Sequence, residues 1–383
     1  MPGTTSWCIW RRPTKQELDR IETFAISQVA EQLLTYGRTF RQGETLYFNW
    51  SGSTVEFCFR GTCLSARFRA DCGYEVEGMP DDPNAPKRAT WPWVAVFLDD
   101  EKTPVRTFQI SSGEETWLLY QSAEETVHRV RLTKLTENAK GILGISGFYG
   151  EGVFLNSERK TRRRMEFVGD SITCGYGNLS KDPSRHFYSA EEDATQAYGP
   201  LAARALGMEY SLISYSGITA LRHPGWMIPN SMDEIYAYTD YPLQRRLGLT
   251  PEKWDFSQET NDYVVINLGT NDCFGILFSG TPGELERFPQ GYEALLVQIR
   301  ACNGPKAHIV CALGTMNYYL YHDIVCALES YRAKTGDSNL SLLRFSPISP
   351  TDGLGADGHP SLETHKKMAK ELTDHIRSLE MKP

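Results

Sequence analysis

The chain has 383 residues, more than the roughly 250–300 at which a single hydrophobic core stops growing, so we expect two domains. With 40% hydrophobic and 23% charged residues, it is not an intrinsically disordered chain. A net charge of −8 argues against nucleic acid as the main partner, and no apolar run approaches the roughly 18 residues of a membrane span.

The first half of the chain has the pattern of β-strands. After a helical pattern over residues 15–32 come short alternating runs rich in Val, Phe, Tyr and Thr, separated by Gly, Asp and Ser. They predict an antiparallel β-sandwich or jelly roll, with the Pro- and Asp-rich residues 75–92 as a loop. The expected strands cover residues 45–50, 54–61, 63–70, 93–100, 105–111, 115–122, 127–135 and 141–150.

The second half has the alternating strand and helix pattern of an α/β domain. Apolar strand patterns alternate with helical ones, as over 283–302 and 361–379, which predicts a parallel sheet covered by helices on both faces. A charged linker precedes it, so we divide the chain into domains 1–158 and 159–383. The expected strands cover residues 164–170, 209–217, 262–272, 307–315 and 341–349.

The cysteines and the N-terminus bear on the cellular compartment. None of the nine cysteines forms a C-x-x-C pair, so we expect free thiols in a reducing cytoplasm, with Cys58 and Cys63 as the best candidates for an exception. The first 20 residues, which include Cys8, lack the apolar core and cleavage site of a secretory signal. We therefore expect a cytoplasmic protein.

Polar residues follow the expected parallel strands where such sheets carry their chemistry, at the carboxyl ends. The first strand ends in Gly-Asp-Ser at Ser171, the second at Gly217, the third at Asn271, and a late loop holds Asp357 and His359.

This set fits acyl transfer to a serine. Ser171 can attack an ester, His359 can take its proton and Asp357 can orient the imidazole. The N–H groups of Ser171 and Gly217 and the amide of Asn271 can bind the oxyanion. The alternative is that Ser171 belongs to an ordinary turn and that Asn271 caps a helix.

Four ordered blocks make the pattern specific. "GDSITCGYGN", "SYSGI", "VVINLGTND" and "DGHPS" resemble those of the SGNH (GDSL-like) hydrolase superfamily, and with the N-terminal sandwich the chain resembles carbohydrate esterase family 2. The resemblance implies a jelly-roll domain packed on an SGNH-hydrolase three-layer α/β/α domain. It also implies removal of acetyl groups from hemicelluloses such as xylan and mannan, often at the primary O6 hydroxyl, without a cofactor.

The chain departs from the superfamily at the third catalytic residue. The acid usually stands three residues before the histidine, where this chain has Ala356, and the nearest acid is Asp357. Some members of family 2 rely on a Ser–His dyad oriented by a backbone carbonyl. Triad and dyad both remain open, with Asp352 as a distant second candidate for the acid.

The candidates for sugar contact are Trp226, Tyr176 and His223, each of which ordinary packing would also explain. No metal-ligand or phosphate-loop spacing is present, so no metal is expected. The chain reads as a serine O-acetylesterase acting on acetylated mannan or xylan oligosaccharides, with no nucleic-acid or membrane partner; no pattern specifies an oligomeric state. The alternatives are a lipase- or thioesterase-like hydrolase of another acyl ester and a carbohydrate-binding protein without useful turnover.

Overall fold

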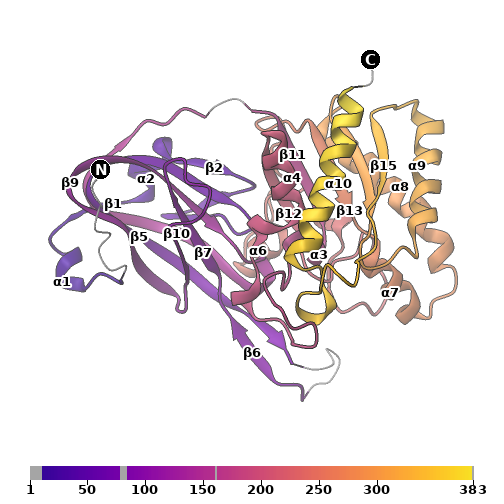
Figure 1. Cartoon of the computed structure of the whole chain (residues 1–383), viewed down its shortest axis with the longest axis horizontal. Coiled ribbons are helices and arrows are strands. Elements are labelled where there is room, and N and C mark those ends of the chain that lie inside the picture. Colours follow the sequence, from indigo (N-terminus) through magenta and orange to yellow (C-terminus); the bar gives the residue numbers. More distant parts are fainter. Residues whose placement is uncertain (1–10, 78–83, 160–161, 382–383) are drawn as a thin grey trace.

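A computed structural model describes residues 11–77, 84–159 and 162–381 of the chain. An antiparallel β domain occupies the N-terminal half and an α/β domain with a parallel sheet the C-terminal half (Figure 1). The fold class predicted from the sequence is confirmed. The last strand of the first domain ends at Leu155 and the first strand of the second begins at Arg164.

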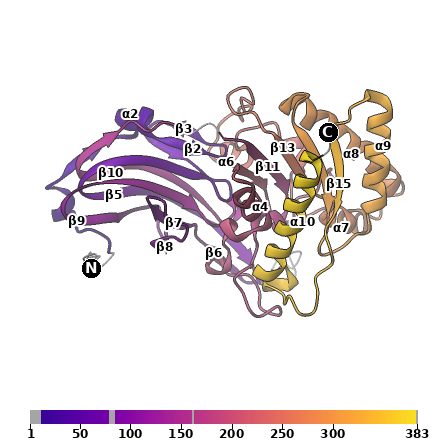
Figure 2. The same ribbon diagram turned by 45° about the horizontal axis from the view of Figure 1, so that its top comes forward.

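The N-terminal domain is built on three long antiparallel strands, which curve side by side in Figure 2. The expected strands 54–61 and 63–70 are one strand, β5, which continues through a bulge between Gly61 and Cys63, because a bulge bends a strand without ending it. Among the described residues the ladder order is β3-β4-β10-β5-β9-β7-β8. The strands are β1 (Glu22–Phe24), β2 (Leu34–Tyr36), β3 (Phe40–Gln42), β4 (Thr45–Tyr47), β5 (Thr54–Val76), β6 (Lys87–Thr90), β7 (Trp93–Leu98), β8 (Arg106–Gln109), β9 (Glu114–Lys134) and β10 (Gly141–Leu155).

Two expectations for this half were wrong, one about a helix and one about a loop. The helical pattern over 15–32 breaks into α1 (Lys15–Leu18), β1, α2 (Ile26–Val29) and the 3₁₀ turn η1 (Ala30–Gln32), because residues 22–24 pair with β10. Part of the expected loop 75–92 is strand β6, which pairs with the end of β5; residues 78–83 lie outside the described residues. The expectation of free thiols is confirmed for the described cysteines, Cys58 and Cys63 included; Cys8 lies outside the described residues.

The parallel sheet has the predicted strands, in the order β12-β11-β13-β14-β15. Successive side chains point to opposite faces, as strand geometry requires. On β11, for example, Phe167 enters one core and Val168 the other. The strands are β11 (Arg164–Gly169), β12 (Glu209–Ser214), β13 (Tyr263–Asn267), β14 (His308–Leu313) and β15 (Leu340–Arg344).

Helices cover both faces of this sheet and make the predicted three layers. Tyr198 of α4 and Leu372 of α10 pack in one core, whereas Leu295 of α8 and Leu328 of α9 pack in the other. Among the described residues, no helix is both long and apolar enough to cross a membrane. The helices are α3 (Ser171–Cys174), α4 (Tyr198–Leu206), α5 (Met232–Ile235), α6 (Tyr241–Arg246), α7 (Thr270–Ser279), α8 (Glu284–Asn303), α9 (Tyr321–Thr335) and α10 (Leu362–Glu380), with 3₁₀ turns η2 (Asn138–Lys140), η3 (Ser189–Glu191), η4 (Ala194–Gln196) and η5 (Ala356–Gly358).

Buried polar contacts join the two domains. The guanidinium of Arg38 donates to both carboxylate oxygens of Glu166 on β11, at 3.1 and 3.2 Å. The indole of Trp50 donates to the Thr239 carbonyl at 2.8 Å, and its ring belongs to the core of the α/β domain. Such contacts fix the β domain against the sheet that carries the candidate site.

Candidate active site

The nucleophile candidate Ser171 lies at the end of a buried strand. Strand β11 ends at Gly169, Asp170 caps α3 by accepting from the Ile172 N–H at 3.0 Å, and Ser171 is the first helical residue. A side chain at position 169 would meet the Thr173 hydroxyl at 2.0 Å, so this sharp exit from the strand requires glycine. The N–H of Ser171 belongs to the first helical turn, where the helix itself provides no acceptor.

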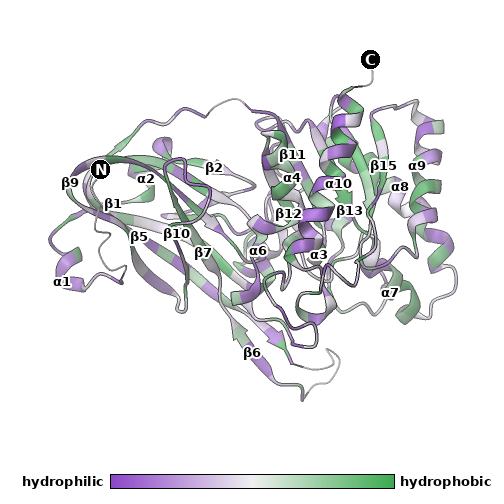
Figure 3. Ribbon diagram, in the orientation of Figure 1, coloured by the Kyte–Doolittle hydropathy of each residue, from purple (hydrophilic) through white to green (hydrophobic). Residues whose placement is uncertain are grey.

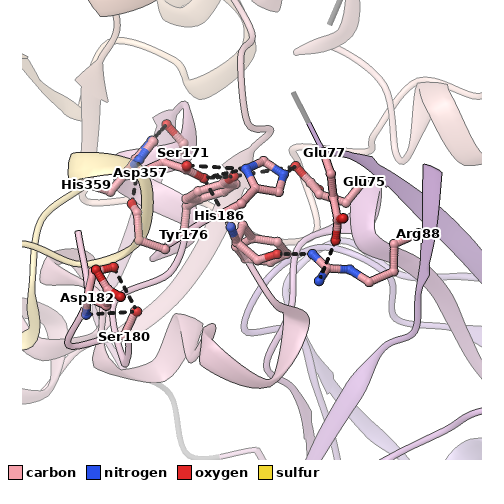
Figure 4. A network of polar contacts seen from close by, with 12 residues as sticks. Glu75, Glu77, Arg88, Ser171, Tyr176, Ser180, Asp182, His186, Asp357 and His359 are labelled. Carbon is pink, nitrogen blue, oxygen red and sulfur yellow. Dashed lines mark hydrogen bonds and ion pairs between the residues drawn. The ribbon is translucent and has the colours of Figure 1, made fainter. Parts of the chain in front are cut away.

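His359 meets Ser171 directly. Its Nε2 lies 3.0 Å from the serine Oγ, and its Nδ1 lies 3.2 Å from the carbonyl oxygen of Ala356 (Figure 4). With Nδ1–H donating to that carbonyl, Nε2 is left as the acceptor for the serine proton. Burial lowers the pKa of His359 below its ordinary value, which keeps the imidazole neutral, and so able to accept a proton, near pH 7.

The structure separates Asp357 from the histidine Nδ1 that a triad acid would hold. Its carboxylate instead accepts from the Tyr176 hydroxyl at 2.9 Å and the Phe187 N–H at 3.2 Å, and lies 3.1 Å from His186 Nδ1 (Figure 4). The backbone carbonyl of Ala356 takes the orienting position. The structure therefore contradicts the prediction that Asp357 orients the imidazole, and the geometry is that of a Ser–His dyad.

Tyr176 is buried rather than open to sugar. Its ring lies 4.3 Å from the His359 ring and 4.3 Å from the Phe187 ring, centroid to centroid, and only 7% of the residue is exposed. The prediction that it contacts sugar was wrong, because its neighbours cover the ring. Tyr176 supports the imidazole from the side and joins it to Asp357.

The oxyanion candidates come from three adjacent strands. Ser171 follows β11, Gly217 follows β12, and Asn271 lies in the first turn of α7 after β13. The Asn271 amide joins these loops, because it donates to the Ile218 carbonyl at 3.0 Å and lies 3.4 Å from the Asp170 carboxylate. The three groups therefore follow neighbouring strands at one edge of the sheet, and their role as oxyanion donors stays a prediction.

His223 lies in the interior and does not face the site. Its Nδ1 lies 2.8 Å from Glu284 and its Nε2 3.1 Å from Asp272, and its side chain is fully buried. Burial lowers its pKa, but the hydrogen bonds and charges of the two carboxylates outweigh this and leave the pKa raised. The prediction of a sugar contact was wrong; the histidine is one member of a buried ion cluster.

Asp272 ties that cluster to the oxyanion loop. Its carboxylate accepts from the N–H groups of Ala220 and Leu221 at 2.8 and 3.1 Å. Asp272 is thus structural, and it fixes the segment just after Gly217.

Trp226 does lie beside the site. Its indole N–H donates to the Gly217 carbonyl at 2.8 Å, and its half-buried ring lies 6.4 Å from that of Phe278, nearly parallel to it. Phe278 of α7, which was not among the predicted sugar contacts, is 75% exposed and neighbours Phe274 on the same helix. Figure 3 shows α7 as a largely hydrophobic helix at the surface. The i, i+4 spacing of two phenylalanines just after Asn271 was the available signal.

One group of described residues has the spacing of a metal site. Ligand atoms of Glu137, Cys174 and Glu192 lie within 4.8 Å of one another in the interior. The ammonium of Lys140 already lies 4.0 Å from Glu137, and burial raises the pKa of the Cys174 thiol well above its ordinary value. The group therefore resembles an internal polar network more than an ion cage.

The fold and the Ser–His pair together define a serine hydrolase built on a parallel sheet. Residues 167–367 match the GDSL-like Lipase/Acylhydrolase family, and residues 35–156 match the N-terminal domain of carbohydrate esterase 2. The chain belongs to carbohydrate esterase family 2, with a C-terminal domain of the GDSL-like family.

Three relatives illustrate the match. The cellulase/esterase CelE of Acetivibrio thermocellus is 31% identical over 86% of this chain. The aligned part covers only 37% of the length of CelE, which is the longer protein. An acetylxylan esterase / glucomannan deacetylase of Cellvibrio japonicus is 24% identical and aligns over 96% of this chain and 93% of its own length. The structure of a family two carbohydrate esterase from Clostridium thermocellum in complex with cellohexaose is 30% identical, with a TM-score of 0.75 over 91% of this chain and 99% of that one.

Proposed function

We propose that the protein is a serine O-acetylesterase that removes acetyl groups from hemicellulose oligosaccharides such as xylan and mannan, with a preference for the primary O6 position. The 3.0 Å contact between Ser171 Oγ and His359 Nε2 carries this proposal, because it joins a nucleophile to a neutral base. The name of one curated relative, an acetylxylan esterase / glucomannan deacetylase, supports the substrate class, and that of another, the cellulase/esterase CelE, supports the ester hydrolysis.

In the first half-reaction Ser171 Oγ attacks the acetyl carbonyl carbon while His359 Nε2 takes the serine proton. The carbonyl oxygen becomes an oxyanion held by the N–H groups of Ser171 and Gly217 and by the Asn271 amide hydrogen that otherwise makes the long, 3.4 Å contact with Asp170. The intermediate collapses as the bond to the sugar oxygen breaks, and His359 gives its proton to that oxygen. The products are a free sugar hydroxyl and an acetyl ester on Ser171.

In the second half-reaction water attacks the acetyl-enzyme and His359 takes a proton from it. The same donors hold the second oxyanion. Collapse breaks the bond to Ser171 Oγ, which recovers the proton from His359 as acetate leaves. The Ala356 carbonyl keeps Nδ1 protonated throughout, so Nε2 alternates between base and acid.

The sugar is proposed to lie against the aromatic side chains that border the oxyanion loop. Trp226 is held by the Gly217 carbonyl, and Phe278 continues the aromatic surface outward with its ring turned only 18° from that of Trp226. Flat apolar faces of this kind suit the apolar faces of pyranose rings.

The test is acetate release from acetylated xylan and acetylated mannan oligosaccharides, with the wild type beside Ser171→Ala. We expect release by the wild type and a loss of at least ~10³-fold in the variant. NMR of the remaining acetyl groups gives the position removed. Release of longer acyl groups in preference to acetyl would favour a lipase-like hydrolase, and glycan binding without release would favour a binding protein.

A further inference from the structure

The Gly217 N–H, one of the proposed oxyanion donors, lies in the middle of a tight turn. The Ile218 N–H donates to the Tyr215 carbonyl at 3.1 Å, so residues 215–218 form a β-turn. Gly217 has φ +80°, the value that a type II turn requires at its third position and that favours glycine there. The donor N–H therefore belongs to the central peptide, between Ser216 and Gly217.

The central peptide of such a turn has two orientations. Types I and II differ mainly by a rotation of this peptide, which reverses the direction of its N–H. An oxyanion donor must be aimed before the charge develops, so the peptides on either side have to be fixed.

Both neighbouring peptides are held by side chains. The peptide between Gly217 and Ile218 is held because its carbonyl, that of Gly217, accepts from the Trp226 indole at 2.8 Å. The peptide between Tyr215 and Ser216 is held because its N–H, that of Ser216, donates to Glu137 Oε2 at 2.7 Å. Between them, no hydrogen bond among the described residues uses the Gly217 N–H, so this donor is available to a ligand.

Glu137 comes from the other domain. It stands between β9 and η2 in the N-terminal half, whereas β12 is the edge strand of the parallel sheet on the side nearest that domain (Figure 1). The carboxylate is fully buried, and the Lys140 ammonium lies 4.0 Å from its second oxygen. Lys134 donates to the Glu137 backbone carbonyl at 3.0 Å, which fixes the residue at its main chain as well.

The same carboxylate also reaches the nucleophile's helix. The Cys174 thiol donates to Glu137 Oε2 at 3.6 Å, and Cys174 is the last residue of the α3 turn that begins at Ser171. One oxygen therefore contacts both the helix that presents the nucleophile and the turn that presents the oxyanion donor.

We propose that Glu137 is a positioning residue of the esterase: its carboxylate holds the Ser216 N–H and thereby aims the Gly217 N–H at the reacting carbonyl oxygen. The β domain then completes the catalytic site rather than only flanking it. This inference rests on the proposed serine esterase function.

Two conservative variants separate this role from that of a buried charge. Glu137→Gln keeps an acceptor oxygen at the same reach and removes the charge, whereas Glu137→Asp keeps the charge and withdraws the acceptor by one methylene. Hydrolysis of 4-nitrophenyl acetate is measured per active serine, counted with a fluorophosphonate, so that unfolded protein does not enter kcat.

We expect kcat of Glu137→Gln within ~3-fold of the wild type, and kcat of Glu137→Asp lower by at least ~10-fold with KM within ~3-fold, as for a misaimed oxyanion donor. If Glu137 only balances the charge of Lys140, the order is reversed, and kcat falls more in Glu137→Gln than in Glu137→Asp. Asp240→Asn is the matched control, because Asp240 is another buried carboxylate bonded across the domain boundary, to Asn49 at 3.0 Å, and we expect its kcat unchanged.

The reverse order, or kcat near the wild type in both Glu137 variants, overturns the proposal. If Glu137→Asp does not fold, Glu137→Gln decides alone, since a loss of ~10-fold or more there contradicts an acceptor role. A wild type that does not hydrolyse the ester overturns the proposed function itself, and this inference with it.

Discussion

Replacing Asp357 with asparagine tests whether the catalytic histidine needs a carboxylate. In the structure the Asp357 carboxylate bonds to Tyr176 and to the Phe187 N–H, while His359 Nδ1 faces the Ala356 carbonyl. Both donors bond to the same oxygen, Oδ2, which asparagine keeps, whereas the other oxygen, Oδ1, lies 3.3 Å from His186 Nδ1. The substitution therefore removes about one hydrogen bond, worth about 1 kcal/mol, and none of the bonds that orient the imidazole.

The expected loss in kcat is accordingly about five-fold at most, since about 1.4 kcal/mol corresponds to ten-fold. A true orienting acid costs about 10⁴-fold when it becomes asparagine. The two readings thus differ by about three orders of magnitude.

The dependence of kcat on pH provides a second measurement on the same variant. Burial lowers the pKa of His359 and the charge of Asp357 acts against it. Removing that charge lowers the pKa further, and the base works only when it is neutral. The acid limb of kcat therefore moves to lower pH in Asp357→Asn.

The assay is kcat against pH for hydrolysis of an activated acetyl ester. Asp352→Asn is the control, since the Asp352 carboxylate lies 3.3 Å from the Lys367 ammonium and accepts from the Ser349 N–H. A loss of 10³-fold or more in Asp357→Asn, with the control unchanged, would refute the dyad.

Three further outcomes follow from the described contacts. Phe278→Ala should raise KM for acetylated oligosaccharides several-fold and leave kcat and KM for 4-nitrophenyl acetate unchanged; an equal effect on both substrates contradicts a sugar contact. Because the pKa of His223 is raised, its stabilising effect is complete below about pH 6.5 and is lost as pH rises through the folded value, so the Tm difference between wild type and His223→Gln should shrink from pH 6 to pH 9. Parallel Tm curves would contradict this. Arg38→Ala leaves Glu166 buried without its cation and should lower the free energy of unfolding by ~3–5 kcal/mol in urea titrations, and a change under 1 kcal/mol would show that the pair does not bind the domains together.

The α/β half could be predicted closely because its signals are local. The parallel strands stand out as short, largely apolar runs, and three of them lead directly into the candidate site, as β11 does into Ser171 and β13 into Asn271. Since such strands align at one edge, Ser171, Gly217 and Asn271 could be placed together without knowing the strand order.

The β half was harder because pairing partners decide its elements. Residues 22–24 form a strand only because β10 lies beside them, and the expected break near Gly61 is a bulge that two neighbouring strands bridge. Neither partner is visible in the local pattern.

The wrong predictions for site residues have a common cause, which is that the surroundings of a side chain depend on the folded structure. His223 and Tyr176 stand next to active-site residues in sequence, yet their side chains turn into the core. Glu137 gives the opposite case, because it is distant in sequence and contacts the oxyanion turn through a domain interface. Side-chain direction and domain packing are properties of the folded chain, and residue spacing does not encode them.

The most direct test of the central claim is to find the acetyl group on the enzyme. An acetylated substrate is mixed with wild-type protein, the reaction is quenched in acid within the steady state, and the peptides are examined by mass spectrometry. If Ser171 is the nucleophile, we expect an acetyl group on Ser171, and none on that peptide in Ser171→Ala. Steady release of acetate with Ser171 unmodified at every quench time, or undiminished release by Ser171→Ala, would contradict it.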